Sequence, residues 1–348
     1  MTLTALDNID KMPHIVTEFD AFGCRYDPSS RAGHYESYFI RANHSSKAQA
    51  FWIRYTLFAA KGGNQAPYGE LWAIYFDGTT NVVCRETVAI DQCEVAKHGL
   101  SVTMGDASLI ADTIHKDTAH KGHAKGSSKT DGNKISWQLD YEGDSQPLLF
   151  LPENYYQRSL PKAKSVVGSP NVNFNGGLTI GSNVIEVKNW QGSVNHNWGP
   201  KHTDRYAWGQ VAGFDNFPDS FLEIVTARVK IGPVLSPALT ILVLRIVDRE
   251  YALNTFWHGM KAKAHYNNFT WQFATKQHNV AIEGNISAAK NCFARLLYPN
   301  PPGDTNYCYN SKIAQCELQV MEVGKPKLTL TTAHRAAFEI LTPDFIDL

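Results

Sequence analysis

The densest group of chemically versatile side chains in this sequence lies between Trp190 and His202, which read W-Q-G-S-V-N-H-N-W-G-P-K-H. Buried indole and imidazole rings need partners for their N–H groups, so this group indicates polar contacts inside an apolar wall, as in small-molecule pockets. His196, Trp198 and His202 are the candidates to line such a pocket. The alternative is structural, because tryptophan, glycine and asparagine also pack turns and corners.

Alternation along a strand would place neighbouring side chains of this segment on opposite faces. His196 and Trp198 would share one face and Asn197 would lie on the other, until Gly199 and Pro200 end the strand. Both faces therefore offer ligand contacts, with Trp198 on one and Asn197 on the other.

Beyond this break, four residues lie at alternate positions and would share one face of an extended segment: His202, Asp204, Tyr206 and Trp208. A histidine and an aspartate two residues apart on one face could perform acid–base chemistry. A hydrogen bond that only stabilises the turn explains the same pair equally well. Tyr206 and Trp208 are predicted ligand contacts beside this pair.

Three carboxyl groups are candidate proton donors: Glu36, Asp204 and Glu223. Glu36 lies in an aromatic run and Glu223 in F-L-E-I-V, where an inward-facing carboxyl group must be paired or neutral. Burial raises the pKa of a carboxyl group and keeps it protonated, as the protonation of an alkene requires. Each group could instead face solvent or pair with a base such as Arg54 or Arg228.

Glu36 and Tyr38 share a strand face, and a hairpin after this strand could bring Arg54 opposite them. This cross-strand cluster would form one edge of a site, or else a buried ion pair of structural value. Trp72, in the aromatic run Glu70 to Phe76, is a further predicted ligand contact.

No metal or cofactor is predicted. His196 and His202 lack a third ligand at a known zinc spacing. Three other histidines fall in a polar segment: His115, His120 and His123. That segment, together with Lys116 to Lys134, is expected to be an exposed loop or a mobile lid. The sequence also lacks the G-x-S-x-G, G-x-G-x-x-G and P-loop motifs, so serine-hydrolase chemistry and nucleotide cofactors are not expected.

Charge and composition disfavour several classes of partner. The 348 residues carry 33 basic and 33 acidic side chains, so no net field draws the chain to nucleic acid. The six cysteines show no C-x-x-C spacing and are expected to be reduced. A basic segment followed by an apolar one is not seen at the N-terminus, so a cytoplasmic location is expected. Prolines and an arginine interrupt the apolar stretch Ile231 to Val247, so no membrane span is predicted.

The elements that must position these residues are strands, because aromatic and β-branched residues recur with a period of two between turn residues. The first three runs, His34 to Arg41, Phe51 to Phe58 and Glu70 to Phe76, are expected to form a meander. Both faces of these runs are apolar, which indicates a core on one side and a cavity or second layer on the other. Further predicted strands are Val82–Ile90, Lys134–Tyr141, Leu178–Ile180, Val184–Lys188, Tyr206–Phe214, Phe221–Val229, Leu239–Val247, Phe269–Thr275, Ala281–Ser287, Ala314–Val320 and Lys327–Thr331.

The predicted fold class is all-β, with two lipocalin-like antiparallel β-barrel or sandwich domains. The Pro-bounded polar segment L-P-K-A-K-S-V-V-G-S-P is the expected junction. The domains would then be 1–160 and 171–348, joined by a linker at 161–170. This division places the Trp190 to His202 segment at the start of the second domain.

Three segments resemble the carotenoid 1,2-hydratase and AttH-like double-lipocalin family: G-H-Y-E-S-Y-F-I-R-A-N-H (Gly33 to His44), N-H-N-W-G-P-K-H (Asn195 to His202) and C-Y-N-S-K-I-A (Cys308 to Ala314). The resemblance implies two lipocalin-like domains and a hydrophobic polyene substrate, to which hydratases add water. Fungal Diels–Alderases of similar plan cyclise polyenes bound between the domains. Fold alone does not decide function.

Two functions are compatible with these observations. The first is a cofactor-independent enzyme of secondary metabolism that hydrates, cyclises or isomerises a polyene or terpenoid-like molecule by confinement and acid or hydrogen-bond catalysis. The second is a carrier that holds an apolar ligand without changing it. A hydrophobic small molecule is the expected partner in both cases, and a homodimer is a possible assembly.

Overall fold

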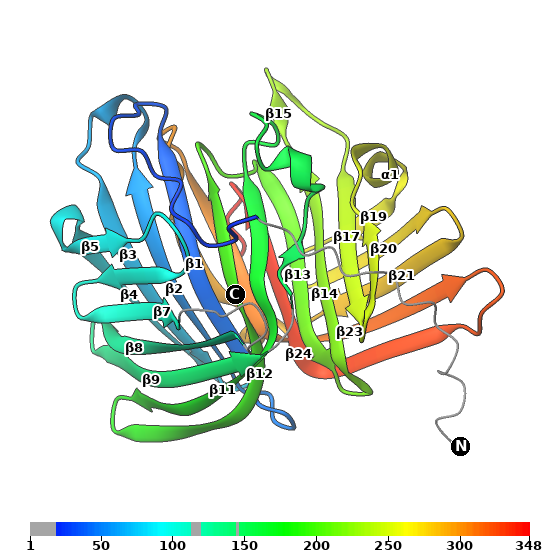
Figure 1. Cartoon of the computed structure of the whole chain (residues 1–348), viewed down its shortest axis with the longest axis horizontal. Helices are drawn as coiled ribbons and strands as arrows, with labels where there is room; N and C mark the ends of the chain where they lie inside the picture. Colours follow the sequence, from blue (N-terminus) through cyan, green and yellow to red (C-terminus); the bar gives the residue numbers. More distant parts are fainter. Residues whose placement is uncertain (1–18, 113–119, 144–145) are drawn as a thin grey trace.

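The computed structural model describes residues 19–112, 120–143 and 146–348. Two large antiparallel sheets, both curled, make up this part of the chain and lie side by side (Figure 1). The all-β prediction is confirmed. The single α-helix of the described residues, α1 (Phe256–Lys261), has six residues, and no helix in these ranges is long and apolar enough to cross a membrane.

The first sheet contains β1 to β12 in the order β4-β3-β2-β1-β12-β11-β9-β8-β7-β6-β5, with β10 paired to β11. Its strands are β1 (His34–Asn43), β2 (Ala50–Ala59), β3 (Tyr68–Phe76), β4 (Asn81–Ala89), β5 (Cys93–Val95), β6 (Ser101–Met104), β7 (Ala107–Ala111), β8 (His120–Thr130), β9 (Asn133–Gly143), β10 (Leu148–Leu149), β11 (Lys164–Ile180) and β12 (Asn183–Gly199). The expected meander at the start of the chain is confirmed. The sheet curls until β8 meets β4, where the Thr130 hydroxyl accepts from Arg85 N at 2.6 Å and donates to Arg85 O at 2.8 Å.

The second sheet runs in the order β18-β17-β14-β13-β24-β23-β21-β20-β19, with β22 paired to β23. Its strands are β13 (Arg205–Phe214), β14 (Phe217–Arg228), β17 (Leu239–Ile246), β18 (Arg249–Leu253), β19 (Lys263–Tyr266), β20 (Thr270–Gln277), β21 (Val280–Ser287), β22 (Ala294–Pro299), β23 (Thr305–Glu322) and β24 (Leu328–Thr342). A separate ribbon pairs β15 (Lys230–Ile231) with β16 (Val234–Leu235). Short 3₁₀ turns occupy Lys61–Gly63, Ile90–Gln92, Glu153–Tyr155 and Lys290–Cys292.

The structure corrects the predicted domain junction, the place of the Trp190 to His202 segment and the predicted polar loop. The predicted linker at 161–170 is wrong as the boundary between the sheets, because β11 begins at Lys164 and pairs with β9 and β12 of the first sheet. The sheets change between Gly199 and Arg205, so the Trp190 to His202 segment ends the first barrel instead of starting the second. The polar segment expected to be a loop forms β8 from His120 onward, while His115 lies outside the described residues.

Alternation within the strands explains which faces are buried. In β9, Trp137 and Leu139 face the interior of the first barrel, while Gln138 and Asp140 are exposed. In β2 every residue is buried, because its outer face packs against the second sheet. This inter-sheet core joins residues of both sheets: Phe39, Trp52, Trp72, Ile74, Phe76, Leu296, Tyr298, Cys308, Ile313 and Leu341. The expectation that one face of the aromatic strands meets a second layer is confirmed.

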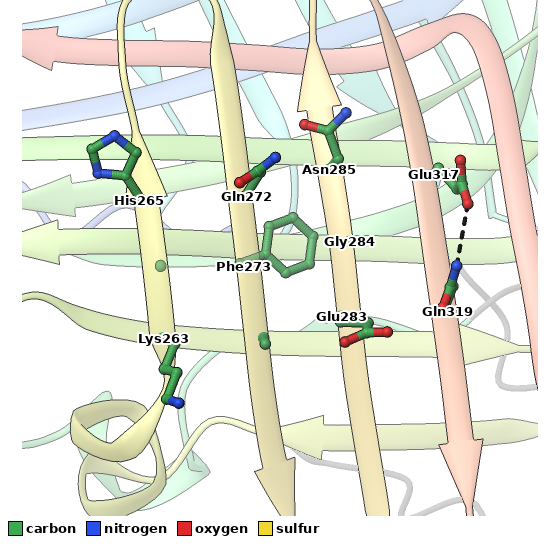
Figure 2. A pocket seen from close by; sticks show the side chains of 11 residues that line it. Lys263, His265, Gln272, Phe273, Glu283, Gly284, Asn285, Glu317 and Gln319 are labelled. Carbon is green, nitrogen blue, oxygen red and sulfur yellow. Dashed lines mark hydrogen bonds between the residues drawn. The ribbon is translucent and has the colours of Figure 1, made fainter.

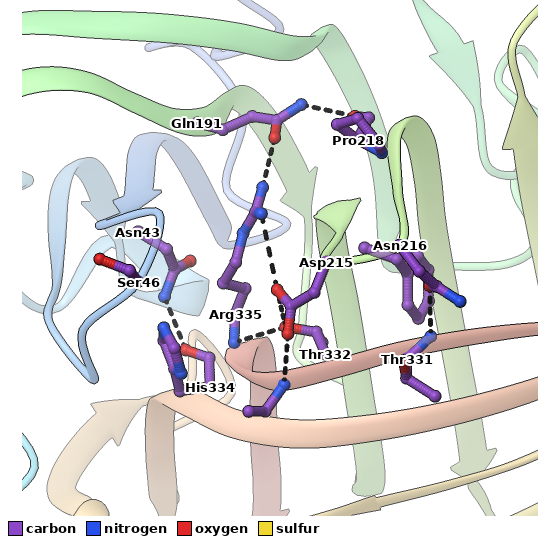
Figure 3. Close-up of polar contacts among 12 residues, drawn as sticks. Asn43, Ser46, Gln191, Asp215, Asn216, Pro218, Thr331, Thr332, His334 and Arg335 are labelled. Atoms are coloured by element: carbon purple, nitrogen blue, oxygen red, sulfur yellow. Dashed lines mark hydrogen bonds and ion pairs between the residues drawn. The ribbon is translucent and has the colours of Figure 1, made fainter.

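Polar contacts also join the two sheets (Figure 3). The Arg335 guanidinium donates to Gln191 Oε1 of β12 and forms an ion pair with Asp215 at 3.6 Å. Gln191 Nε2 in turn donates to the carbonyl of Pro218 at 2.8 Å. Asn43 Nδ2 donates to the carbonyl of His334 at 3.2 Å. The relative position of the sheets is therefore held by side chains from several strands.

Candidate functional site

A cavity of about 1020 Å³ lies between the two sheets. Its apolar wall comes from strands of both sheets and from the segments that precede β11 and follow β18: Phe39, Trp52, Phe150, Leu151, Trp208, Val225, Leu239, Ile241, Phe256 and Met260. A site of this size and composition can enclose most of an apolar small molecule.

Polar groups gather on the wall where β2, β22 and the β12–β13 connection meet. The Arg54 guanidinium donates to Ser37 Oγ at 2.7 Å and lies 4.5 Å from the ring centroid of Tyr298. His202 stacks on Tyr35 with 3.8 Å between ring centroids. Burial and the charge of Arg54 lower the pKa of His202 to about 3, so its imidazole is neutral near pH 7.

Two phenols on this wall are neutral hydrogen-bonding groups. Tyr206 and Tyr298 line the cavity, and burial raises the pKa of both well above 10. A phenol with so high a pKa retains its proton at physiological pH and can donate a hydrogen bond to a ligand.

An ion pair from the second sheet supplies the one carboxylate among the cavity-lining residues. Glu339 on β24 accepts from Lys312 Nζ at 2.6 Å and from Asn310 Nδ2 at 2.9 Å. Cys308 Sγ lies 3.7 Å from the same carboxylate. The Lys312 ammonium is fully buried and lies 5.4 Å from the Trp52 ring centroid. This pair carries no net charge.

Glu223 lies directly behind the cavity wall. Its carboxylate accepts from Trp208 Nε1 and from Gln210 Nε2, each at 2.8 Å. Burial raises the pKa of Glu223 to about 7, although these two hydrogen bonds act in the opposite direction. Glu223 does not itself line the cavity, but Trp208, whose indole it holds, does.

Four of the predicted site residues face the interior of the first barrel instead. His196 Nε2 and Glu36 Oε1 lie 2.8 Å apart, and the Tyr38 hydroxyl donates to the same carboxylate oxygen at 2.9 Å. His196 is stacked between Tyr38 and Trp198, at 4.3 and 4.6 Å. Burial would raise the pKa of Glu36, but hydrogen bonds with His196 and His34 outweigh it and hold the pKa well below the usual range.

This Glu36 cluster anchors the start of the described chain. His196 Nδ1 bonds to the carbonyl of Ala21 at 2.8 Å, and Arg25 N donates to Glu36 at 2.8 Å. The expected approach of Arg54 to Glu36 and Tyr38 is wrong, because Arg54 pairs with Phe39 in the β1–β2 ladder and so lies on the opposite face of the sheet.

Two other predicted residues are also engaged elsewhere. Asp204 accepts from Lys201 at 3.0 Å and from Lys230 N at 2.8 Å, so the predicted pair with His202 does not form. Trp72 packs in the inter-sheet core and donates to Glu70 Oε2 at 3.2 Å. Neither residue lines the cavity.

The cavity thus combines five predicted residues with several that the sequence reasoning missed. The predicted ones are Arg54, Asn197, His202, Tyr206 and Trp208; the missed ones include Tyr35, Tyr298 and Glu339. Side-chain alternation places Tyr35 on the same strand face as Phe39, so this rule could have identified Tyr35 as a cavity residue. Glu339 lies in the apolar run A-A-F-E-I-L, where a carboxylate signals a buried partner.

Other potential sites are less developed. The described residues contain no group of three His, Cys, Asp or Glu side chains arranged to hold a metal ion. A second hollow lies on the outer face of β19, β20, β21 and β23 (Figure 2). Its wall is mainly exposed and polar, with Lys263 and His265 on β19 and Glu283 on β21, two strands that β20 separates. It lacks the apolar enclosure of the inter-sheet cavity.

Comparisons with known proteins agree with this architecture. No family model matches the sequence, and no curated protein matches it significantly. Among solved structures, an AttH-type protein from Nitrosomonas europaea has a TM-score of 0.57 at 12% identity, over 97% of this chain and 99% of that one. Kievitone hydratase from Nectria haematococca has a TM-score of 0.54 at 9% identity, over 89% of each chain.

A third similar structure is CghA with Sch210972, with a TM-score of 0.50 at 11% identity, over 94% of this chain and 96% of that one. Identities this low carry information on the fold alone. The chain has the lipocalin-like double-barrel fold of these proteins, as the sequence resemblance predicted.

Proposed function

We propose that this chain is a cofactor-independent enzyme that binds a hydrophobic polyene or terpenoid-like molecule between its two barrels and hydrates, cyclises or isomerises it. The observation that carries the proposal is the inter-sheet cavity of about 1020 Å³, with an aromatic and aliphatic wall and a few clustered polar groups. One similar structure is named a hydratase, which supports hydration as one of the three reactions.

The chemistry follows from confinement and a few donors. An apolar wall built on Trp52, Trp208 and Ile241 would hold a flexible chain in one folded conformation, which lowers the entropic part of the barrier. The protonated phenols of Tyr206 and Tyr298 would donate hydrogen bonds to an oxygen of the substrate. Glu339 is the cavity-lining carboxylate, and Glu223, with its raised pKa, is a nearby reservoir for a proton.

The test is turnover together with binding. Purified protein is incubated with a panel of linear polyenes and terpenoids, and the products are separated by chromatography with mass detection. New products that need Tyr206 and Tyr298 would support the enzyme. A ligand that is retained and recovered unchanged would favour the carrier function, for which the same cavity is sufficient. The cytoplasmic location, the role in secondary metabolism and the homodimer expected from the sequence stay predictions.

A further inference from the structure

Arg54 is a buried cation that has no carboxylate partner among the described residues. It lies on β2 with 5% of its surface exposed, and its side chain lines the inter-sheet cavity. Its hydrogen bond to Ser37 Oγ is a contact with a neutral group. Arg54 Nε is buried and has no acceptor in the described part of the chain.

The nearest candidate carboxylates are already engaged. Glu70 forms its ion pair with Arg85, and Glu339 forms its ion pair with Lys312 at 2.6 Å. Burial acts to lower the pKa of Arg54, and the nearby charges of Glu70 and Glu339 help to raise it. Neither carboxylate bonds to the guanidinium, so no direct anion contact replaces the hydration that burial removes. The planar fork of N–H groups on arginine matches the two oxygens of a carboxylate.

The wall around Arg54 has an excess of positive charge that the chain as a whole does not have. Overall the sequence carries 33 basic and 33 acidic residues. The cavity lining, in contrast, includes one acidic residue, Glu339, against six basic ones: Arg54, Arg158, Lys162, Lys164, Lys201 and Lys230. Lys201 is neutralised by its ion pair with Asp204, which leaves five. Such a wall favours entry of an anion. His202 adds no charge, since its imidazole is neutral near pH 7.

We infer that the cavity ligand is an apolar carboxylate, whose carboxylate oxygens accept hydrogen bonds from Arg54 while its hydrocarbon body lies against Trp52, Trp208 and Ile241. This inference rests on the proposed function in one respect, that the cavity is the ligand site. It narrows the substrate class from polyene or terpenoid-like molecules in general to those that carry a carboxylate.

The test compares two probes that differ only at the head group, cis-parinaric acid and its methyl ester, by probe fluorescence at pH 7.5. The intact protein is expected to bind the acid at least tenfold more tightly than the ester. Arg54→Gln is expected to lose at least tenfold in affinity for the acid and less than threefold for the ester. Arg54→Lys keeps the charge and should retain part of the preference. Arg31→Gln, at an exposed arginine outside the cavity lining, is the matched control and should change either affinity by less than threefold.

The possible results separate the two proposals. Equal affinity of the intact protein for acid and ester overturns the inference and leaves an apolar binding cavity in place. Failure of both probes to bind overturns the cavity as the ligand site. If Arg54→Gln does not fold, the pH dependence of binding to the intact protein tests the inference instead. Affinity for the acid must fall as the pH drops below the pKa of the free acid. Affinity for the ester must stay constant. The same pH profile for both probes overturns the inference.

Discussion

Arg54 of the first sheet and Tyr298 of the second lie in contact across the inter-barrel cavity, with the guanidinium carbon 4.5 Å from the centroid of the phenol ring. Each residue belongs to a strand that has no backbone pairing with the other sheet. Residues of both barrels therefore form the polar end of the cavity. Changes that shift one barrel against the other should alter this contact and the ligand site together.

Filling the cavity should block binding without unfolding the protein. Ala227 lines the cavity from β14, so Ala227→Trp should place an indole in the space a ligand would occupy. We expect at least a tenfold loss of affinity for cis-parinaric acid methyl ester, measured by fluorescence titration. The control is Ala274→Trp, which alters the exposed hollow on the outer sheet face. An equal loss in both variants would contradict the assignment of the site.

Glu223 should make the stability of the protein depend on pH. Its pKa is about 7 in the folded protein and 4.5 when unfolded, so the folded state holds the proton more tightly and the free energy of unfolding falls as pH rises between these values. The shift corresponds to about 3 kcal/mol. Glu223→Gln removes the titration, so the variant should gain about this much relative to the parent between pH 4.5 and 8, by urea unfolding.

Gln272→Ala, on the exposed face of β20, is the control for this measurement because it removes no titratable group. Its free energy of unfolding should keep a constant difference from that of the parent over the same pH range. A constant difference for Glu223→Gln as well would show that Glu223 titrates normally in the folded protein.

His196 should contribute mainly to stability. His196→Ala removes its hydrogen bonds with Glu36 and with the carbonyl of Ala21, and leaves a fully buried carboxylate with fewer partners. Breaking a buried pair in this way costs about 3–5 kcal/mol. Urea unfolding should show this loss, and limited proteolysis should show faster cleavage near residues 19–26. Ligand affinity of the folded fraction should stay unchanged.

His34→Ala is the matched control, because His34 bonds to the other oxygen of Glu36 at 2.9 Å but is partly exposed. Its loss should cost less than the loss of His196, because the His34 side chain is 17% exposed and water can replace its hydrogen bond. A large drop in turnover for His196→Ala, with stability intact, would instead support the catalytic role predicted from the sequence.

Arg41 should couple the two barrels. Its guanidinium is fully buried and donates to the carbonyls of Gln210 at 2.9 Å and Arg335 at 3.1 Å, both in the second sheet. Hydrogen bonds from a charged donor contribute about 1.5–3 kcal/mol each, so Arg41→Ala should lose about 3 kcal/mol or more. Calorimetry should then resolve two unfolding transitions. Arg31→Ala, at an exposed arginine, should retain the behaviour of the parent; a single unshifted transition in Arg41→Ala would refute the coupling.

Local patterns in the sequence were sufficient to predict most of the strands. The period of two predicted the strands, and apolar side chains on both faces of the first three strands predicted a second layer behind them. Parity also separated Asn197, which reaches the cavity, from Trp198 on the other face. The junction was misplaced because the prolines and polar residues at 161–170 resemble a linker, although most residues at the start of β11 are buried. Composition does not reveal where hydrogen bonding between strands continues.

The sequence by itself determined an all-β chain whose strands carry apolar groups on two faces, because side-chain alternation is a local property of extended backbone. Only the tertiary structure decided which face meets the second barrel. Glu36 and Arg54 lie on adjacent strands, yet register turns one into the first barrel and the other into the cavity. Contacts such as those of Arg54 with Tyr298 join residues far apart in sequence, so they exist only once both sheets have packed.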